Sequence, residues 1–88
     1  MISKDIIVMN NSGIHARPAS LFVSTASKFK SNIMVSKGTS KGNAKSMLNI
    51  LSLGITKDSN ITISADGDDA AEAVDTLIKL VESKFGEE

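Results

Sequence analysis

The residues GIHARPAS at positions 13 to 20 contain the chain's single histidine, single arginine and single proline. A core-facing helix requires none of the three, yet His15, Arg17 and Pro18 stand where an apolar helical pattern begins. A neutral imidazole nitrogen is a competent nucleophile toward phosphorus near neutral pH, and a guanidinium is a forked donor suited to phosphate oxygens. These residue types at this spacing indicate a site that accepts and holds a phosphoryl group.

The proline indicates where the helix begins. Proline is tolerated in the first turn of a helix but not in its interior, so Pro18 predicts a helix start near Ala16. His15 then becomes the cap residue, beside amides that have no intrahelical partner and the positive end of the helix dipole. A lone histidine in this place also fits a plain polar cap. A hydrolytic triad is not supported, because the chain has no second histidine.

The second motif is AKSMLNILSLG at positions 44 to 54. Serine is a good helix cap and glycine is preferred just past a helix end, so Ser46 and Gly54 predict a two-turn helix over residues 46–53. At roughly 100° per residue, Ile50 and Leu53 share one face. The other apolar side chains, Met47, Leu48 and Leu51, are predicted to lie on the other side of the helix. One core does not cover both faces, so we expect an exposed apolar docking patch; burial of the whole helix beneath a loop is the alternative.

Ser46 has two interpretations, a simple cap residue or a phosphorylation site. Phosphate there adds about −1.5 to −2 charges at the favourable end of a helix, so it should not unfold the protein. We hypothesise that it instead blocks an acidic partner, because the charge lies beside the apolar patch. Ser20 and Leu21 lie on the outer side of the first helix and are expected to extend the docking surface.

Flanking elements follow from periodicity. Strands are predicted at residues 2–8, 33–36, 39–43 (at an edge) and 60–65, and helices from residue 16, over 46–53 and from residue 69, where Asp69 and Glu72 resemble a capping box. The order βαββαβα predicts an α+β open-faced β-sandwich, a four-stranded antiparallel sheet with three helices on one face.

Composition limits the function classes. The 88 residues are 41% hydrophobic and 23% charged, which predicts one globular domain over residues 1–88. No apolar run approaches the ~18 residues of a membrane span, and Lys4 and Asp5 interrupt any signal-peptide core, so we expect a cytoplasmic protein without membrane insertion. Without cysteine, neither a disulfide nor a metal site is expected.

Charge is unevenly distributed. Residues 1–57 contain eight lysine or arginine side chains and one carboxylate, a net charge of +7, and residues 58–88 carry −7. Such asymmetry can steer an encounter with an acidic partner. Direct nucleic-acid binding is not expected, because three phenylalanines are the only aromatic residues.

GIHARPAS, with KSMLNILSLGI downstream, resembles the histidine-containing phosphocarrier (HPr) family of the bacterial phosphotransferase system, over nearly the whole chain. The resemblance implies that His15 accepts phosphate on its δ nitrogen from enzyme I and donates it to sugar-specific enzyme II A components. Such a protein is a substrate shared by enzymes, not an enzyme, and no cofactor is expected. We expect Ser12, Ala16 and Arg17 to bind the phosphate and the protein to be a monomer.

The resemblance also implies a regulatory role for Ser46. It matches the family's target of HPr kinase/phosphorylase, whose product acts with a catabolite control regulator, although serine also occurs here in relatives without that kinase. The docking positions of the family are matched by Met47, Leu48 and Leu51. An alternative function is an HPr-like regulatory binding module, serving catabolite repression or a nitrogen-related phosphotransferase system.

Overall fold

Strands and helices succeed one another in the order that the sequence predicts. The structure is a computed structural model that describes residues 1–9, 13–14 and 16–86. The strands are β1 (Ile2–Ile7), β2 (Asn32–Lys37), β3 (Ser40–Asn43) and β4 (Asn60–Asp66), and the helices are α1 (Ala16–Ala26), α2 (Met47–Ser52), α3 (Ala70–Glu82) and a 3₁₀ turn, η1 (Lys84–Gly86). The sequence did not predict η1.

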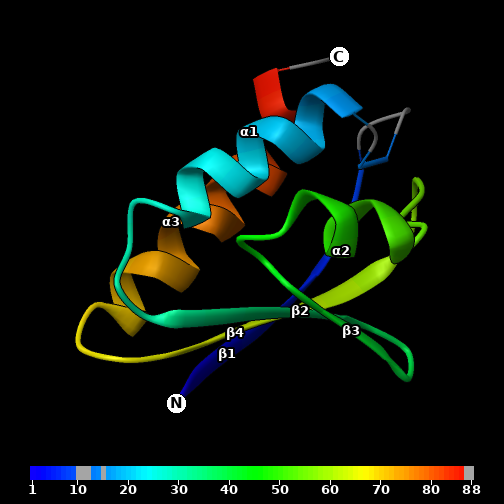
Figure 1. The fold of residues 1–88 in the computed structure, drawn as a ribbon. Helices are drawn as coiled ribbons and strands as arrows, with labels where there is room; N and C mark the ends of the chain where they lie inside the picture. The colour runs from blue at the N-terminus through cyan, green and yellow to red at the C-terminus, as the bar shows by residue number, and fades with distance from the viewer. Residues whose placement is uncertain (10–12, 15, 87–88) are drawn as a thin grey trace.

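The sheet is antiparallel throughout, with the strand order β1-β4-β2-β3. The prediction that β3 lies at an edge is therefore confirmed. Register places Ile6 opposite Ile61 and Val35 opposite Ile63, so that apolar side chains of neighbouring strands lie on the same face. Figure 1 shows α1, α2 and α3 above this sheet, with β1 and β4 passing beneath α3.

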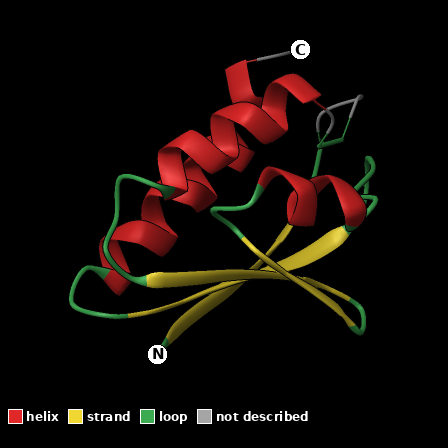
Figure 2. Ribbon diagram, in the orientation of Figure 1, coloured by secondary structure: helices red, strands yellow, loops and turns green. Residues whose placement is uncertain are grey.

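The core lies between the sheet and the three helices. Alternation along β4 buries Ile61, Ile63 and Ala65, as predicted, and leaves the residues between them more exposed. From the helices, Phe22 of α1 and Leu77 of α3 are fully buried. The opposite face of the sheet carries no helix in the described part of the chain (Figure 2). The predicted open-faced sandwich is therefore confirmed.

The start of α3 differs from the prediction. Asp69 is the N-cap residue but makes no side-chain cap hydrogen bond, and Glu72 is exposed, so the predicted capping box was wrong. The Asp69 carboxylate instead accepts hydrogen bonds from the amides of Lys30 (2.8 Å) and Ser31 (3.0 Å) and from the Ser31 hydroxyl. Ser31 is 2% exposed, so its donors would be left unpaired without this carboxylate. Asp69 therefore ties the α1–β2 connection to the start of α3.

This tie should make stability depend on pH. The Ser31 hydroxyl and then the Lys30 amide hold the pKa of Asp69 below its ordinary value of 3.8, and desolvation opposes them. Because the folded-state pKa is lowered, the ionised carboxylate stabilises the protein at pH values above its ordinary pKa. This contribution is lost as the pH falls through the folded-state pKa. We expect Asp69→Asn to reduce the free energy of unfolding at pH 7 and to flatten its pH dependence below about pH 4, in urea denaturation at a series of pH values.

The exposed neighbouring carboxylate supplies the control, since Asp68→Asn should leave both quantities close to wild type. The same acid-induced loss of stability in Asp69→Asn as in the wild-type protein would contradict the assignment.

Candidate functional site

The entrance of α1 is built as the proline predicts. The helix begins at Ala16, and Pro18 is buried in its first turn. That turn contains no acidic side chain, and Arg17 is exposed. Among the residues that the structure describes, Arg17 makes no ion pair. The helix dipole and the exposed guanidinium therefore place positive charge at the same end of α1.

Two predicted site residues, Ser12 and His15, lie outside the described residues. Their neighbours Ile14, Ala16 and Arg17 are described, so the place of the site along the chain is defined by the residues on either side. The roles of Ser12 and His15 stay predictions.

Backbone contacts hold the chain just before α1. The Ile14 amide donates to the Ile55 carbonyl at 3.0 Å, and Ile14 is buried. Gly13 has a φ of +61°, and a Cβ built on it would lie 2.5 Å from the Ile55 carbonyl oxygen and 2.6 Å from Thr56 Cα. Glycine is thus required twice, for the left-handed backbone and for the close approach. The start of α1 is seated on the segment that follows α2.

The structure confirms Ser46 as a helix cap. It has extended backbone angles (φ −113°, ψ 114°), and its hydroxyl accepts a hydrogen bond from the Asn49 amide at 3.2 Å. The Asn49 side chain accepts a second bond from the Asn43 amide at 3.0 Å, which ties α2 to β3. At the other end, Gly54 is left-handed with a φ of +63°, as expected of the residue after a helix. Ser46 as a phosphorylation site stays a prediction.

The two faces of α2 separate as predicted. Ile50 is fully buried and Leu53 is 8% exposed, whereas Leu48 is 77% and Leu51 42% exposed. Met47, which was predicted to lie with Leu48 and Leu51, is instead half-buried against the core, because it precedes Ile50 by three residues and so lies at the edge of the buried face. The alternative, burial of the whole helix, is contradicted. On α1, which contacts α2, Ser20 is exposed and Leu21 is 40% exposed. We call Leu21, Met47, Leu48 and Leu51 the apolar patch.

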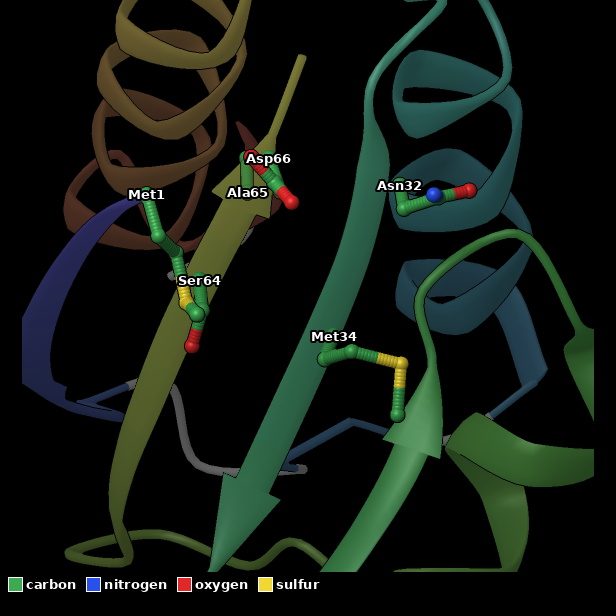
Figure 3. A pocket seen from close by; sticks show the side chains of 6 residues that line it. All are labelled: Met1, Asn32, Met34, Ser64, Ala65 and Asp66. Atoms are coloured by element: carbon green, nitrogen blue, oxygen red, sulfur yellow. The ribbon is translucent and has the colours of Figure 1, made fainter.

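A shallow hollow lies elsewhere, on the outer side of the sheet between β2 and β4 (Figure 3). Its lining residues are Met1, Asn32, Met34, Ser64, Ala65 and Asp66. None of the predicted site residues contributes to it. It is therefore not the site that the sequence indicates.

The sequence did not predict the hydrogen bonds that two lysine side chains make with backbone carbonyls. The Lys37 ammonium donates to the Gly54 carbonyl at 2.8 Å, and the Lys45 ammonium donates to the Phe29 carbonyl at 2.6 Å. Lys37 thus satisfies a carbonyl just past the end of α2, and Lys45 links the residue before Ser46 to the end of the α1 region. A count of charges gives no sign of such contacts, because they depend on which distant carbonyls the fold brings near.

Other classes of site find no support in the described part of the chain. Its His, Cys, Asp and Glu side chains nowhere form a group of three or more that could hold a metal ion. Its helices are all too short or too polar to cross a membrane.

The structure defines a small α+β open-faced sandwich whose first helix begins with an exposed arginine and no acidic side chain. The family model described as "PTS HPr component phosphorylation site" matches residues 2–83. The chain therefore belongs to the HPr family of the phosphotransferase system, as the sequence resemblance predicted.

Two relatives and two solved structures illustrate the similarity. The chain is 41% identical over 81 residues to the phosphocarrier protein HPr of Haemophilus influenzae, covering 92% of this chain and 95% of that protein. It is 40% identical over 84 residues to the HPr-like protein Crh of Halalkalibacterium halodurans, covering 96% and 100%. A crystal structure of HPr from Thermoanaerobacter tengcongensis superposes with a TM-score of 0.97 at 52% identity, covering 100% and 99%. Another structure of HPr from that organism is of a dimer (TM-score 0.80, 54% identity, coverage 93% and 94%), and the monomeric state of this protein stays a prediction.

The two faces of α2 should differ in their effect on stability. Ile50→Ala removes a fully buried side chain and should cost about 2–5 kcal/mol of unfolding free energy. Leu48→Ala removes a side chain that is mostly in solvent and should change it by less than about 0.5 kcal/mol. Urea denaturation of both variants measures the difference. Comparable losses would show that Leu48 is part of the core and not of a free surface.

Proposed function

We propose that this protein is a phosphocarrier that accepts a phosphoryl group on His15 from phosphorylated enzyme I. It then passes the group to sugar-specific enzyme II A components during sugar uptake. The observation that carries the proposal is the first turn of α1, which directly follows His15 in the chain and presents Arg17 without any acidic side chain. Membership of the HPr family supports the same chemistry. The unit is one phosphocarrier domain over residues 1–88.

The reaction is a displacement at phosphorus. The bond between phosphorus and the donor enzyme breaks while a phosphorus–nitrogen bond to the His15 imidazole forms, so no water or oxidant is consumed. The negative charge of the arriving group is met by the first amides of α1, including that of Ala16, by Ser12 and by Arg17. The phosphorus–nitrogen bond stays reactive enough to be passed on. Because phosphoryl transfer needs mainly positioning and charge neutralisation, each partner enzyme supplies the remainder.

Partners dock on the apolar patch beside this entrance. Leu48 and Leu51 are apolar but exposed, so the core does not use them, and Leu21 is exposed on the neighbouring α1. Ser20 lies on the same helix and is also exposed. The positive net charge of residues 1–57 favours acidic partners.

A second function has support from a specific similarity. The chain is 40% identical to the HPr-like protein Crh of Halalkalibacterium halodurans, against 41% to one HPr and 52% to another. In the regulatory alternative, Ser46 is phosphorylated by an HPr kinase/phosphorylase, and the apolar patch contacts a catabolite control regulator or the partners of a nitrogen-related system. The two functions are compatible in one protein, and His15 distinguishes them.

Labelled phosphoenolpyruvate and enzyme I test the carrier function. We expect label on this protein that is labile in acid and stable in base, as a phosphorus–nitrogen bond requires, and no label on His15→Ala. Arg17→Ala should be labelled at least roughly tenfold more slowly, since one charge-assisted donor is lost. Counting the label over time gives the rates of the three proteins, and counting after acid and after base treatment checks the bond.

An unlabelled wild-type protein would reject the carrier assignment. Normal sugar-dependent phosphoryl flow in cells carrying His15→Ala, together with altered gene regulation, would instead support the regulatory module.

The proposed effect of phosphate at Ser46 can be tested by adding a negative charge there without losing the helix cap. Aspartate and asparagine both cap helices as well as serine, but only aspartate adds charge. We expect Ser46→Asp to raise the KM for phosphorylation by enzyme I while Ser46→Asn stays near wild type, with unchanged circular dichroism spectra for both. Equal KM values for the two variants would argue against electrostatic blocking by a phosphate at this position.

A further inference from the structure

The turn at residues 55–59, between α2 and β4, holds the chain on both sides of the candidate site. The Val8 amide donates to the Ser59 carbonyl at 2.9 Å, and the Asp58 amide donates to the Val8 carbonyl at 2.7 Å. After the site segment, the Ile14 amide donates to the Ile55 carbonyl at 3.0 Å. One short turn therefore fixes where the chain leaves β1 and where it enters α1.

The contacts between this turn and the chain on either side of the site leave little room for either to shift. Val8 and Ile14 are both buried, so water cannot readily replace the hydrogen bonds that their backbone groups make with the turn. Gly13 packs on Ile55 and Thr56 so closely that not even a methyl group would fit. A displacement of the turn must consequently displace the start of α1, or break these hydrogen bonds.

The turn is closed by two hydroxyl side chains. The Ser59 amide donates to the Thr56 carbonyl at 3.1 Å, and in return the Thr56 amide donates to the Ser59 hydroxyl at 3.0 Å. The hydroxyls of Thr56 and Ser59 lie 3.2 Å apart, within hydrogen-bond distance. Between them Asp58 has a φ of +73°, in the left-handed region that costs a non-glycine residue energy. The side-chain bonds, together with the backbone bonds, oppose relaxation of this strained turn.

These side chains contribute little to the core. Thr56 is exposed and Ser59 is only half-buried, and neither belongs to the core cluster. The turn also lies outside the apolar patch, which is formed by α1 and α2. Its hydroxyls are therefore placed to affect the geometry of the site while leaving the docking surface and most of the folding free energy intact.

We propose that Thr56 and Ser59 are positioning residues for phosphoryl transfer at His15, acting through the backbone contacts of Val8, Gly13 and Ile14. The proposal rests on the proposed function for its kinetic consequence. Its structural consequence, a defined setting of the chain on either side of the site, does not.

Single hydroxyl deletions test the proposal. Ser59→Ala removes the acceptor of the Thr56 amide, and Ser59→Thr restores a hydroxyl on the same backbone. Ser27→Ala is the matched control, because it deletes another exposed hydroxyl bond, from Ser27 to the Val23 carbonyl at 2.8 Å, beyond the far end of α1. Ser31→Ala controls for lost stability, because it removes a donor to Asp69, also far from the entrance.

Initial rates with enzyme I and phosphoenolpyruvate give kcat and KM for each variant. We expect Ser59→Ala to lower kcat about tenfold with KM within about twofold of wild type, since orientation and not docking is lost. Ser59→Thr should recover most of the rate, and the two controls should keep the wild-type kcat. A wild-type kcat in Ser59→Ala, or an equal fall in Ser31→Ala, would overturn the proposal.

Nuclear magnetic resonance provides a readout that does not depend on phosphoryl transfer. In Ser59→Ala we expect faster hydrogen exchange at the Ile14 amide and a changed pH profile of the His15 ring resonances, with Ser27→Ala unchanged. If the wild-type protein accepts no label, the proposed function fails, and these resonances still decide the matter. Identical exchange and ring profiles in Ser59→Ala and wild type would reject the positioning role.

Discussion

The hydrogen bond from the Ile14 amide to the Ile55 carbonyl is the contact on which the site depends. A helix entrance can attract an anion only if its first amides stay open and its orientation is fixed by something other than the anion. Here Pro18 and the stripe that includes Phe22 bury one side of α1, while Ile14 anchors the chain just ahead of it. The amides of the first turn are thereby held in place at the exposed end of a helix that has one side buried.

The same division between buried support and exposed surface recurs in α2. Ile50 and Leu53 secure the helix to the core, the Asn49 side chain ties it to β3, and Lys37 satisfies the carbonyl of Gly54. With so many attachments beneath and at its ends, the helix does not need Leu48 or Leu51 for its own stability. Apolar side chains that a fold does not use for itself are free for recognition, and their exposure is tolerated where a partner covers them.

Periodicity and caps carried most of the fold prediction. Alternation in β4, the helical stripe of α1 and the pairing of Ser46 with Gly54 are local signals, and the structure follows each of them. Asp69 shows why other contacts were not predicted. Its spacing to Glu72 is right for a capping box, but the fold brings Ser31 close enough to donate a hydrogen bond to the Asp69 carboxylate. A contact between residues 38 positions apart leaves no local signal. The anchoring of Ile14 by Ile55 escaped for the same reason, while the residue types of the site itself were visible because chemistry restricts them.

The two candidate modification positions lie at helix starts of different character, and this separates their expected effects. At α1 the helix has 11 residues, its first turn holds a guanidinium, and no side chain of that turn carries negative charge, so a phosphoryl group there would be held by fixed positive charge. At α2 the helix has six residues and the serine hydroxyl already accepts the Asn49 amide. Phosphate oxygens at Ser46 could accept the same bond, so the backbone would have no reason to move. The added charge would then be felt on the surface beside Met47 and Leu48, where we propose that partners dock. One position suits a group that is transferred, and the other suits a charge that stays and alters binding.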